Sequence, residues 1–139
     1  MANINTQNVS EAEEALKLAY TDLIAFGKLF LPDDFLRSET PFFHYEVADS
    51  IDNKEVKQCA IIIPRGHGKT VLTKASMLKD FVFCKDDFLF YAWVSATQKL
   101  SVGNMDYIRH HLEFNDRLKY YFGNLKGKKW TEEDIELSN

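Results

Sequence analysis

The sequence predicts an α/β fold in which a parallel sheet is flanked by helices, with a further helix at the N-terminus. The run Cys59–Ile63 is apolar at every position, which is typical of a central parallel strand covered on both faces. A glycine-containing loop and a helical pattern follow it, and 88–94 is a second apolar run. This order predicts a βαβ unit with a right-handed crossover, in which ligands bind at the carboxyl ends of the strands.

The elements of the first half follow from capping signals and periodicity. Residues 1–9 are polar and are expected to be disordered. Ser10 followed by Glu13 predicts a capping box, so a helix is expected to begin at about Glu11. It should end before Pro32, because a residue that precedes proline avoids the helical region. A turn-rich segment, a helix and a strand are then expected over 33–41, 44–52 and 56–63.

The second half shows the same alternation. A helix is predicted from about Lys69 to Val82, and Asp86-Asp87 marks a turn after it. The apolar strand 88–94 comes next. A helix over 98–113 and a strand over 130–137, with Ile135 and Leu137 on the same face, complete the expected elements.

Composition and charge limit the function classes. The 139 residues are 45% hydrophobic and 27% charged, as in an ordinary globular domain. With 17 basic and 21 acidic residues the net charge is −4, so any contact with DNA must be local. No apolar run approaches the ~18 residues of a membrane span, and no membrane partner is expected. Cys59 and Cys84 lie in apolar runs and are expected to be buried free thiols.

The loop 64–70 carries the chemistry. Gly68, Lys69 and Thr70 match the end of the phosphate-loop pattern, whereas Ile63 stands where that pattern has its first glycine. Glycines let the backbone turn tightly and approach an anion. The freed amides and the helix N-terminus then present positive partial charge to phosphate oxygens. The expected nucleotide-binding residues are Pro64, Arg65, Gly66, His67, Gly68, Lys69 and Thr70.

Each side chain of the loop has an expected role toward ATP and Mg²⁺. Lys69 should pair with the β and γ phosphates, and the Thr70 hydroxyl should bind Mg²⁺. Arg65 is either an arginine finger supplied within the chain or a solvated arginine. His67 needs to contribute only its backbone amide. Arg65 and Lys69 are therefore the expected catalytic residues.

The loop, the upstream segment Phe42–Glu46 and the downstream segment Trp93–Gln98 together resemble the large terminase subunit of tailed bacteriophages. The resemblance extends from about residue 25 onward. It implies an ATP-driven motor that translocates double-stranded DNA into procapsids in the host cytoplasm. Its implied partners are the portal protein and the small terminase subunit, and it would act as a homo-oligomeric ring.

The resemblance also assigns residues outside the loop. Phe43 and His44 would lie near the adenine, although core packing of the aromatic ring is an equal alternative. Ser95, Thr97 and Gln98 would contact DNA or couple nucleotide state to motion, although a helix cap by Ser95 or Thr97 also fits.

Hydrolysis also needs an apolar strand that ends in Asp-Glu, and the sequence has none. The nearest imitation, 81–87, is interpreted as a helix end and a turn, and 132–134 as a solvated acidic surface. In the family this strand and a nuclease domain lie farther along. Residues 1–139 are therefore expected to form the incomplete, N-terminal portion of a P-loop NTPase domain without the nuclease domain. ATPase activity of this chain alone stays uncertain, and we expect weak nucleotide binding with little hydrolysis.

Two other readings remain open. The chain could belong to another P-loop enzyme, such as a helicase or a small-molecule kinase, or it could be a truncated nucleotide-binding module without catalysis. A basic cluster near the C-terminus either touches phosphates or is a solvated loop. Its members are Lys126, Lys128 and Lys129.

Overall fold

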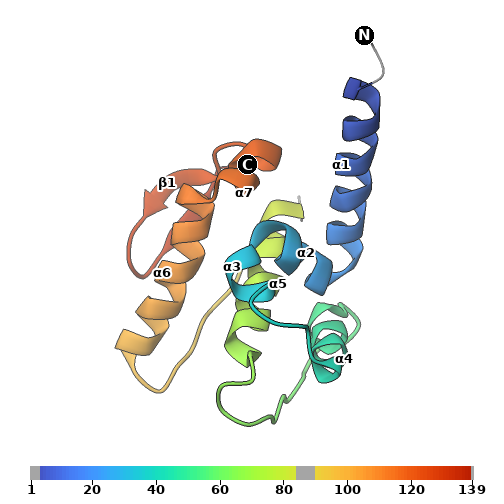
Figure 1. The fold of residues 1–139 in the computed structure, drawn as a ribbon. Coiled ribbons are helices and arrows are strands. Elements are labelled where there is room, and N and C mark those ends of the chain that lie inside the picture. Colours follow the sequence, from blue (N-terminus) through green and yellow to red (C-terminus); the bar gives the residue numbers. More distant parts are fainter. Residues whose placement is uncertain (1–3, 84–89, 139) are drawn as a thin grey trace. The chain divides into compact units, whose positions relative to one another are not determined.

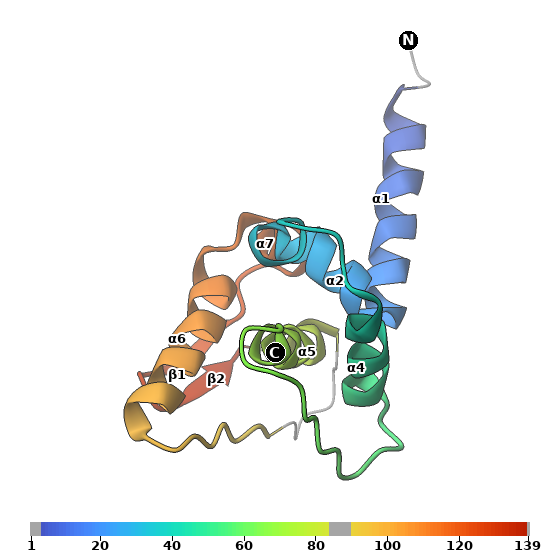
Figure 2. The same ribbon diagram turned by 60° about the horizontal axis from the view of Figure 1, so that its bottom comes forward.

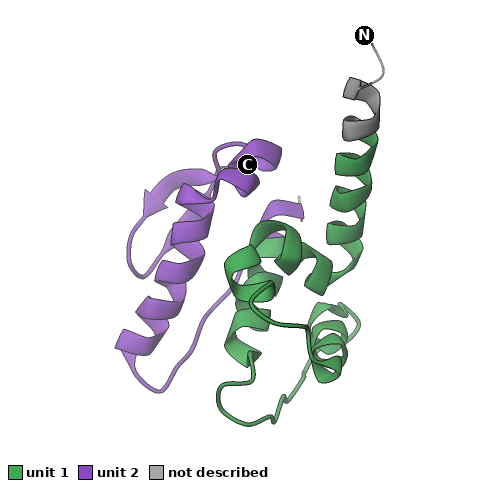
Figure 3. Ribbon diagram, in the orientation of Figure 1, with its two compact units in different colours: residues 1–79 green, residues 80–139 purple. Residues whose placement is uncertain are grey.

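The computed structural model describes residues 4–83 and 90–138, and this part of the chain is mostly helical (Figure 1). Seven helices and one two-stranded antiparallel sheet make up its regular structure. The prediction of a P-loop-type parallel sheet flanked by helices was therefore wrong for the described residues. The chain divides into two compact units, residues 1–79 and 80–139, which are described separately (Figure 3).

The first unit begins with two helices where one was predicted. Helix α1 spans Ile4–Thr21 and α2 spans Leu23–Phe30, so the chain is helical well before Glu11. Asp22 separates them because its backbone is extended, and its side chain accepts a hydrogen bond from the Ala25 amide at 2.9 Å.

Three further helices follow in this unit. The short α3, Pro32–Phe35, starts at the proline that was expected to end the preceding helix. Helix α4 spans Phe42–Asp52 and confirms the predicted helix over 44–52. Helix α5 spans Lys69–Phe83, one residue beyond the predicted end, and its residues from Asp80 onward belong to the second unit.

The core of the first unit lies on α2 and α5. The Phe35 ring occupies the space beside Gly27 that a Cβ would fill, so α3 packs directly on the backbone of α2. Asp52 forms a buried ion pair with Lys79, which ties the end of α4 to α5. The largest buried side chains of this unit are Phe26, Phe30, Leu31, Leu72 and Leu78.

The described residues of the two predicted parallel strands lie in coil and have no sheet partners among the described residues. The chain between α4 and α5, and the chain leading into α6, run as coil (Figure 2). Ile62 is 93% exposed and Val94 is 89% exposed, and Cys59 is also exposed. An apolar run favours an extended backbone, but a strand also needs a neighbour about 4.8 Å away to satisfy its amides and carbonyls. Here the only paired strands of the described residues are those of the hairpin near the C-terminus.

The second unit contains α6, Gln98–Phe114, and α7, Asp116–Phe122, followed by strands β1, Lys126–Trp130, and β2, Ile135–Leu137. The helix predicted over 98–113 is confirmed. The strand expected over 130–137 is divided, because Trp130 ends β1 and pairs across the hairpin with Ile135. Ile108, Leu112 and Leu118 form the core. Cys84, the Asp86-Asp87 turn and the start of 88–94 lie outside the described residues.

None of the helices in the described ranges combines the length and the apolar character that a bilayer crossing requires.

Candidate phosphate-binding site

The loop 64–68 leads directly into α5, which begins at Lys69 as the sequence predicts. Gly66 has φ 84° and Gly68 has φ 80°. Residues with a side chain rarely adopt this left-handed region, so both turns need glycine. The conformation of the loop therefore depends on Gly68, which the phosphate-loop pattern singles out, and on Gly66, which lies between the pattern's two glycine positions.

Side chains donate hydrogen bonds to carbonyl oxygens of the loop. Lys69 Nζ donates to the Pro64 carbonyl at 3.0 Å and also to the Ile63 carbonyl. His67 Nδ1 donates to the Arg65 carbonyl at 3.1 Å, within the loop itself. His44 Nε2, from α4, donates to the His67 carbonyl at 2.9 Å. Both rings must carry a proton on the bonded nitrogen, because a carbonyl oxygen can only accept.

The amides of the loop remain available for an external acceptor. In a trans peptide the N–H points opposite to the C=O, so fixing these carbonyls turns the amides of Arg65, Gly66 and Gly68 the other way. The hydrogen bonds within the described residues include none donated by the amides of 65–71. These residues line an open hollow of about 510 Å³, called here the loop hollow. Its backbone donors suit an anion.

The charged and hydroxyl side chains of the loop differ in their surroundings. Arg65 and Thr70 are exposed, and among the described residues no hydrogen bond or ion pair holds either side chain. Lys69 is half-buried and is held by the Ile63 and Pro64 carbonyls. The ammonium group must leave these carbonyls, or share its protons with them, in order to meet a phosphate.

Phe43 and His44 lie beside the loop, on the first turn of α4. The Phe43 ring meets the His44 ring edge-on at 4.6 Å between centroids, and the His67 ring at 6.0 Å. A Cβ built on Gly68 would lie 3.0 Å from Cε1 and Nε2 of His44. The structure thus brings these two predicted residues to the loop, where they contact its backbone and the His67 ring.

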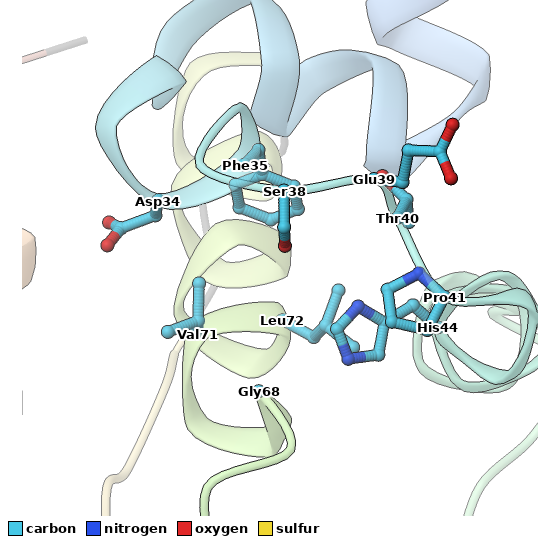
Figure 4. Close-up of a pocket in the computed structure, with 10 residues that line it drawn as sticks. All are labelled: Asp34, Phe35, Ser38, Glu39, Thr40, Pro41, His44, Gly68, Val71 and Leu72. Carbon is cyan, nitrogen blue, oxygen red and sulfur yellow. The ribbon is translucent and has the colours of Figure 1, made fainter.

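A small pocket of about 90 Å³ lies on the His44 side of Gly68 (Figure 4). The segment between α3 and α4 supplies polar side chains to it, and α5 supplies apolar ones. Sequence reasoning treated 38–41 only as turn-rich and missed this role, because no motif marks it. The lining residues include Ser38, Glu39, Thr40, Val71 and Leu72.

The predicted coupling residues belong to the other compact unit and all have local partners. Thr97 is the N-cap of α6, and its hydroxyl accepts from the Leu100 amide at 3.4 Å. Ser95 Oγ accepts from the Trp93 indole at 3.2 Å. Gln98 donates from its side chain to Glu133. For Thr97 this is the helix-cap alternative that the sequence left open.

Two lysines of the basic cluster are already paired. Lys126 lies 2.8 Å from Glu113, and Lys129 lies 2.8 Å from Asp134. The hydrogen bond from Lys126, and then that from Trp130, lowers the pKa of Glu113. These pairs weaken the cluster as a phosphate contact, because its charge is partly balanced.

The side chains of the loop can be compared with the ligands that Mg²⁺ prefers. Mg²⁺ is held in proteins by one or two carboxylates, water and substrate phosphates. Within the described ranges no group of three or more His, Cys, Asp or Glu side chains could hold a metal ion. The exposed Thr70 hydroxyl fits as one protein ligand to an ion that phosphates would otherwise coordinate.

Comparison with known proteins adds no further assignment. No protein-family model, no curated protein and no solved structure matches this chain. Function is therefore inferred from the loop itself and from the motifs around it.

Proposed function

We propose that residues 64–70 bind the triphosphate of ATP together with Mg²⁺, in the nucleotide-binding part of a terminase-type DNA-packaging motor. One observation carries the nucleotide site. Gly66 and Gly68 hold the loop in a conformation in which side chains bond the Pro64, Arg65 and His67 carbonyls, and in which the loop amides have no acceptor among the described residues. Such backbone donors at the start of a 15-residue helix bind phosphate oxygens favourably.

In this proposal the side chains act on the phosphates as the sequence pattern implies. Lys69 exchanges its carbonyl partners for β and γ phosphate oxygens, and the Thr70 hydroxyl binds Mg²⁺. Arg65 lines the loop hollow, its guanidinium has no partner among the described residues, and it stabilises charge on the γ phosphate. Phe43 and His44 flank the loop on the side where the base is proposed to lie.

The motor part of the proposal rests on three segments that follow one another in the sequence, namely Phe42–Glu46, the loop and Trp93–Gln98. Coupled to ATP hydrolysis in the complete protein, the motor would move double-stranded DNA into a procapsid in the host cytoplasm. A ring of subunits, the portal protein and the small terminase subunit are its proposed partners. Ser95, Thr97 and Gln98 remain proposed coupling residues, on the resemblance alone.

A second candidate is a nucleotide-binding module without hydrolysis. The sequence has no apolar strand that ends in Asp-Glu, which would normally orient the attacking water. This candidate shares the same loop and predicts ATP binding with no turnover, even when partners are added.

A titration with a fluorescent ATP analogue and Mg²⁺ tests the nucleotide site. Replacing Lys69 by alanine removes charge-assisted hydrogen bonds worth about 2–3 kcal/mol, so affinity should fall about 30- to 150-fold. Lys17→Ala, an exposed lysine of α1 in the same unit, is the matched control and should bind as wild type. Equal binding by the Lys69 and Lys17 variants would contradict the proposal.

The motor is tested separately in the complete protein. ATP turnover stimulated by double-stranded DNA and by the portal protein supports it. Turnover that responds to neither supports a kinase or another P-loop enzyme, whereas absent turnover supports the binding module.

A further inference from the structure

His44 makes a contact with the loop that nucleotide binding by itself does not require. Its Nε2 donates to the His67 carbonyl at 2.9 Å across 23 residues of sequence. Its ring also lies against Gly68, where a Cβ would be 3.0 Å away. The ring lines the small pocket but not the loop hollow. His44 therefore touches the loop from the side opposite to the proposed phosphates.

The stereochemistry of the peptide links this contact to the anion site. The His67 carbonyl and the Gly68 amide belong to one planar trans peptide, so they point in opposite directions. Holding the carbonyl toward α4 holds the amide away from α4. Gly68 at φ 80° has no side chain to restrict this peptide, and without a partner the peptide could rotate.

We infer that His44 is a positioning residue of the phosphate-binding loop: its hydrogen bond to the His67 carbonyl aims the Gly68 amide at the anion. This inference rests on the proposed function for the claim that the ligand is an anion. The hydrogen bond from His44 to the His67 carbonyl forms without any ligand. It assigns His44 an indirect role, exerted through the backbone, in place of the direct adenine contact that the resemblance implied.

Phe43 supports the same arrangement from α4. Its ring lies edge-on to His44 and within 6.0 Å of the His67 ring, measured between centroids. Such aromatic pairs restrict the orientation of the histidine ring. The imidazole is thereby held in the orientation that donates to the carbonyl, with little rotational freedom.

Two substitutions separate the hydrogen bond from the packing. His44→Phe keeps a ring against Gly68 and Phe43 but has no donor, whereas His44→Gln loses the ring but keeps a donating N–H. Loss of one hydrogen bond should weaken ATP binding about fivefold in His44→Phe. His44→Gln should restore most of the affinity, which a purely structural role of the ring would not allow.

The loop can also be observed without nucleotide. Selective ¹⁵N-glycine labelling gives signals from only 6 glycines. The Gly66 and Gly68 amide signals should shift or broaden in His44→Phe and return toward wild type in His44→Gln. Gly103 in α6 has nothing within 4 Å of a built Cβ and serves as the internal control. In wild type, long-range ¹H–¹⁵N spectra should place the proton of His44 on Nε2.

The outcomes separate the two proposals. Loop signals and affinity that change together in His44→Phe and recover in His44→Gln support the inference. Unchanged Gly68 signals, unchanged affinity, or a His44→Gln variant no better than His44→Phe each overturn it. If Lys69→Ala binds ATP as wild type, the proposed function fails, and the ligand-free glycine signals still decide whether His44 holds the loop.

Discussion

Replacing Gly68 by alanine is expected to damage the loop through two separate effects. Gly68 has φ 80°, a region that costs a residue with a Cβ about 1–2 kcal/mol. The new Cβ would also lie 3.0 Å from Cε1 and Nε2 of His44, so the imidazole must shift by a few tenths of an ångström, which lengthens its hydrogen bond to the His67 carbonyl. Weakening of that hydrogen bond adds about 0.5–1 kcal/mol.

The two effects sum to about 1.5–3 kcal/mol, which corresponds to an ATP affinity about 10- to 150-fold weaker. Gly66→Ala isolates the backbone effect, because Gly66 has φ 84° but nothing within 4 Å of a built Cβ. It should weaken binding only about 5- to 30-fold. Gly103→Ala, inside α6, should leave affinity unchanged and stabilise the helix by about 0.5–1 kcal/mol.

Fluorescent ATP titrations of these three variants, with urea unfolding of each, measure the series. ATP affinity should fall most in the Gly68 variant, less in the Gly66 variant and not at all in the Gly103 variant. Equal affinity of the Gly68 and Gly103 variants would refute the loop conformation, and equal affinity of the Gly68 and Gly66 variants would refute the contact with His44.

Urea unfolding should show that Leu78→Ala, at a fully buried site, costs about 2–5 kcal/mol, whereas Ile62→Ala, at a 93% exposed site, stays within about 0.5 kcal/mol. A large cost at Ile62 would mean that its segment is covered after all. Lys79→Met leaves its buried carboxylate partner at the end of α4 unpaired and should cost about 3 kcal/mol by the same assay, against no change if the pair is absent. The pKa of Glu113 is lowered by the hydrogen bond from Lys126, so its stabilisation is complete above the ordinary value of 4.5 and is lost as pH falls through the folded-state pKa. The stability difference between wild type and Glu113→Gln should therefore vanish in acid, and a difference that persists there would contradict this.

Helices were predictable from the sequence where local signals agree. Helices α4, α5 and α6 occur where apolar spacing and, for α6, the Thr97 cap place them. The break at Asp22 was missed because the apolar periodicity continues across it, while the decisive cap is a single side chain.

Sheet structure could not be derived in the same way, because a strand depends on a partner that is distant in sequence. The run Cys59–Ile63 favours an extended backbone, but it lies in coil and no described strand pairs with it. The hairpin of β1 and β2 was also missed. Its close approach needs Gly127, where a Cβ would collide with the Glu136 backbone, and nothing in the local pattern marks this.

The loop was the most predictable part of the site. Gly66 and Gly68 have the positive φ values that their chemistry suggests, whereas Lys69 donates to the Ile63 and Pro64 carbonyls, a contact that the sequence did not predict. The bond from His44 to a backbone carbonyl was not predictable, because any residue at 67 offers the same carbonyl. The pattern thus indicates what binds, and only the three-dimensional contacts indicate what holds the loop in place.

The central claim, that the amides of this loop bind the phosphates of ATP, can be measured by amide NMR of the whole chain during addition of ATP and Mg²⁺. The largest shifts should fall on Arg65, Gly66, Gly68 and Lys69, and Lys69→Ala should need about 30- to 150-fold more ATP to produce them. Unchanged signals of these amides, or the same ATP dependence in Lys69→Ala and wild type, would contradict the claim.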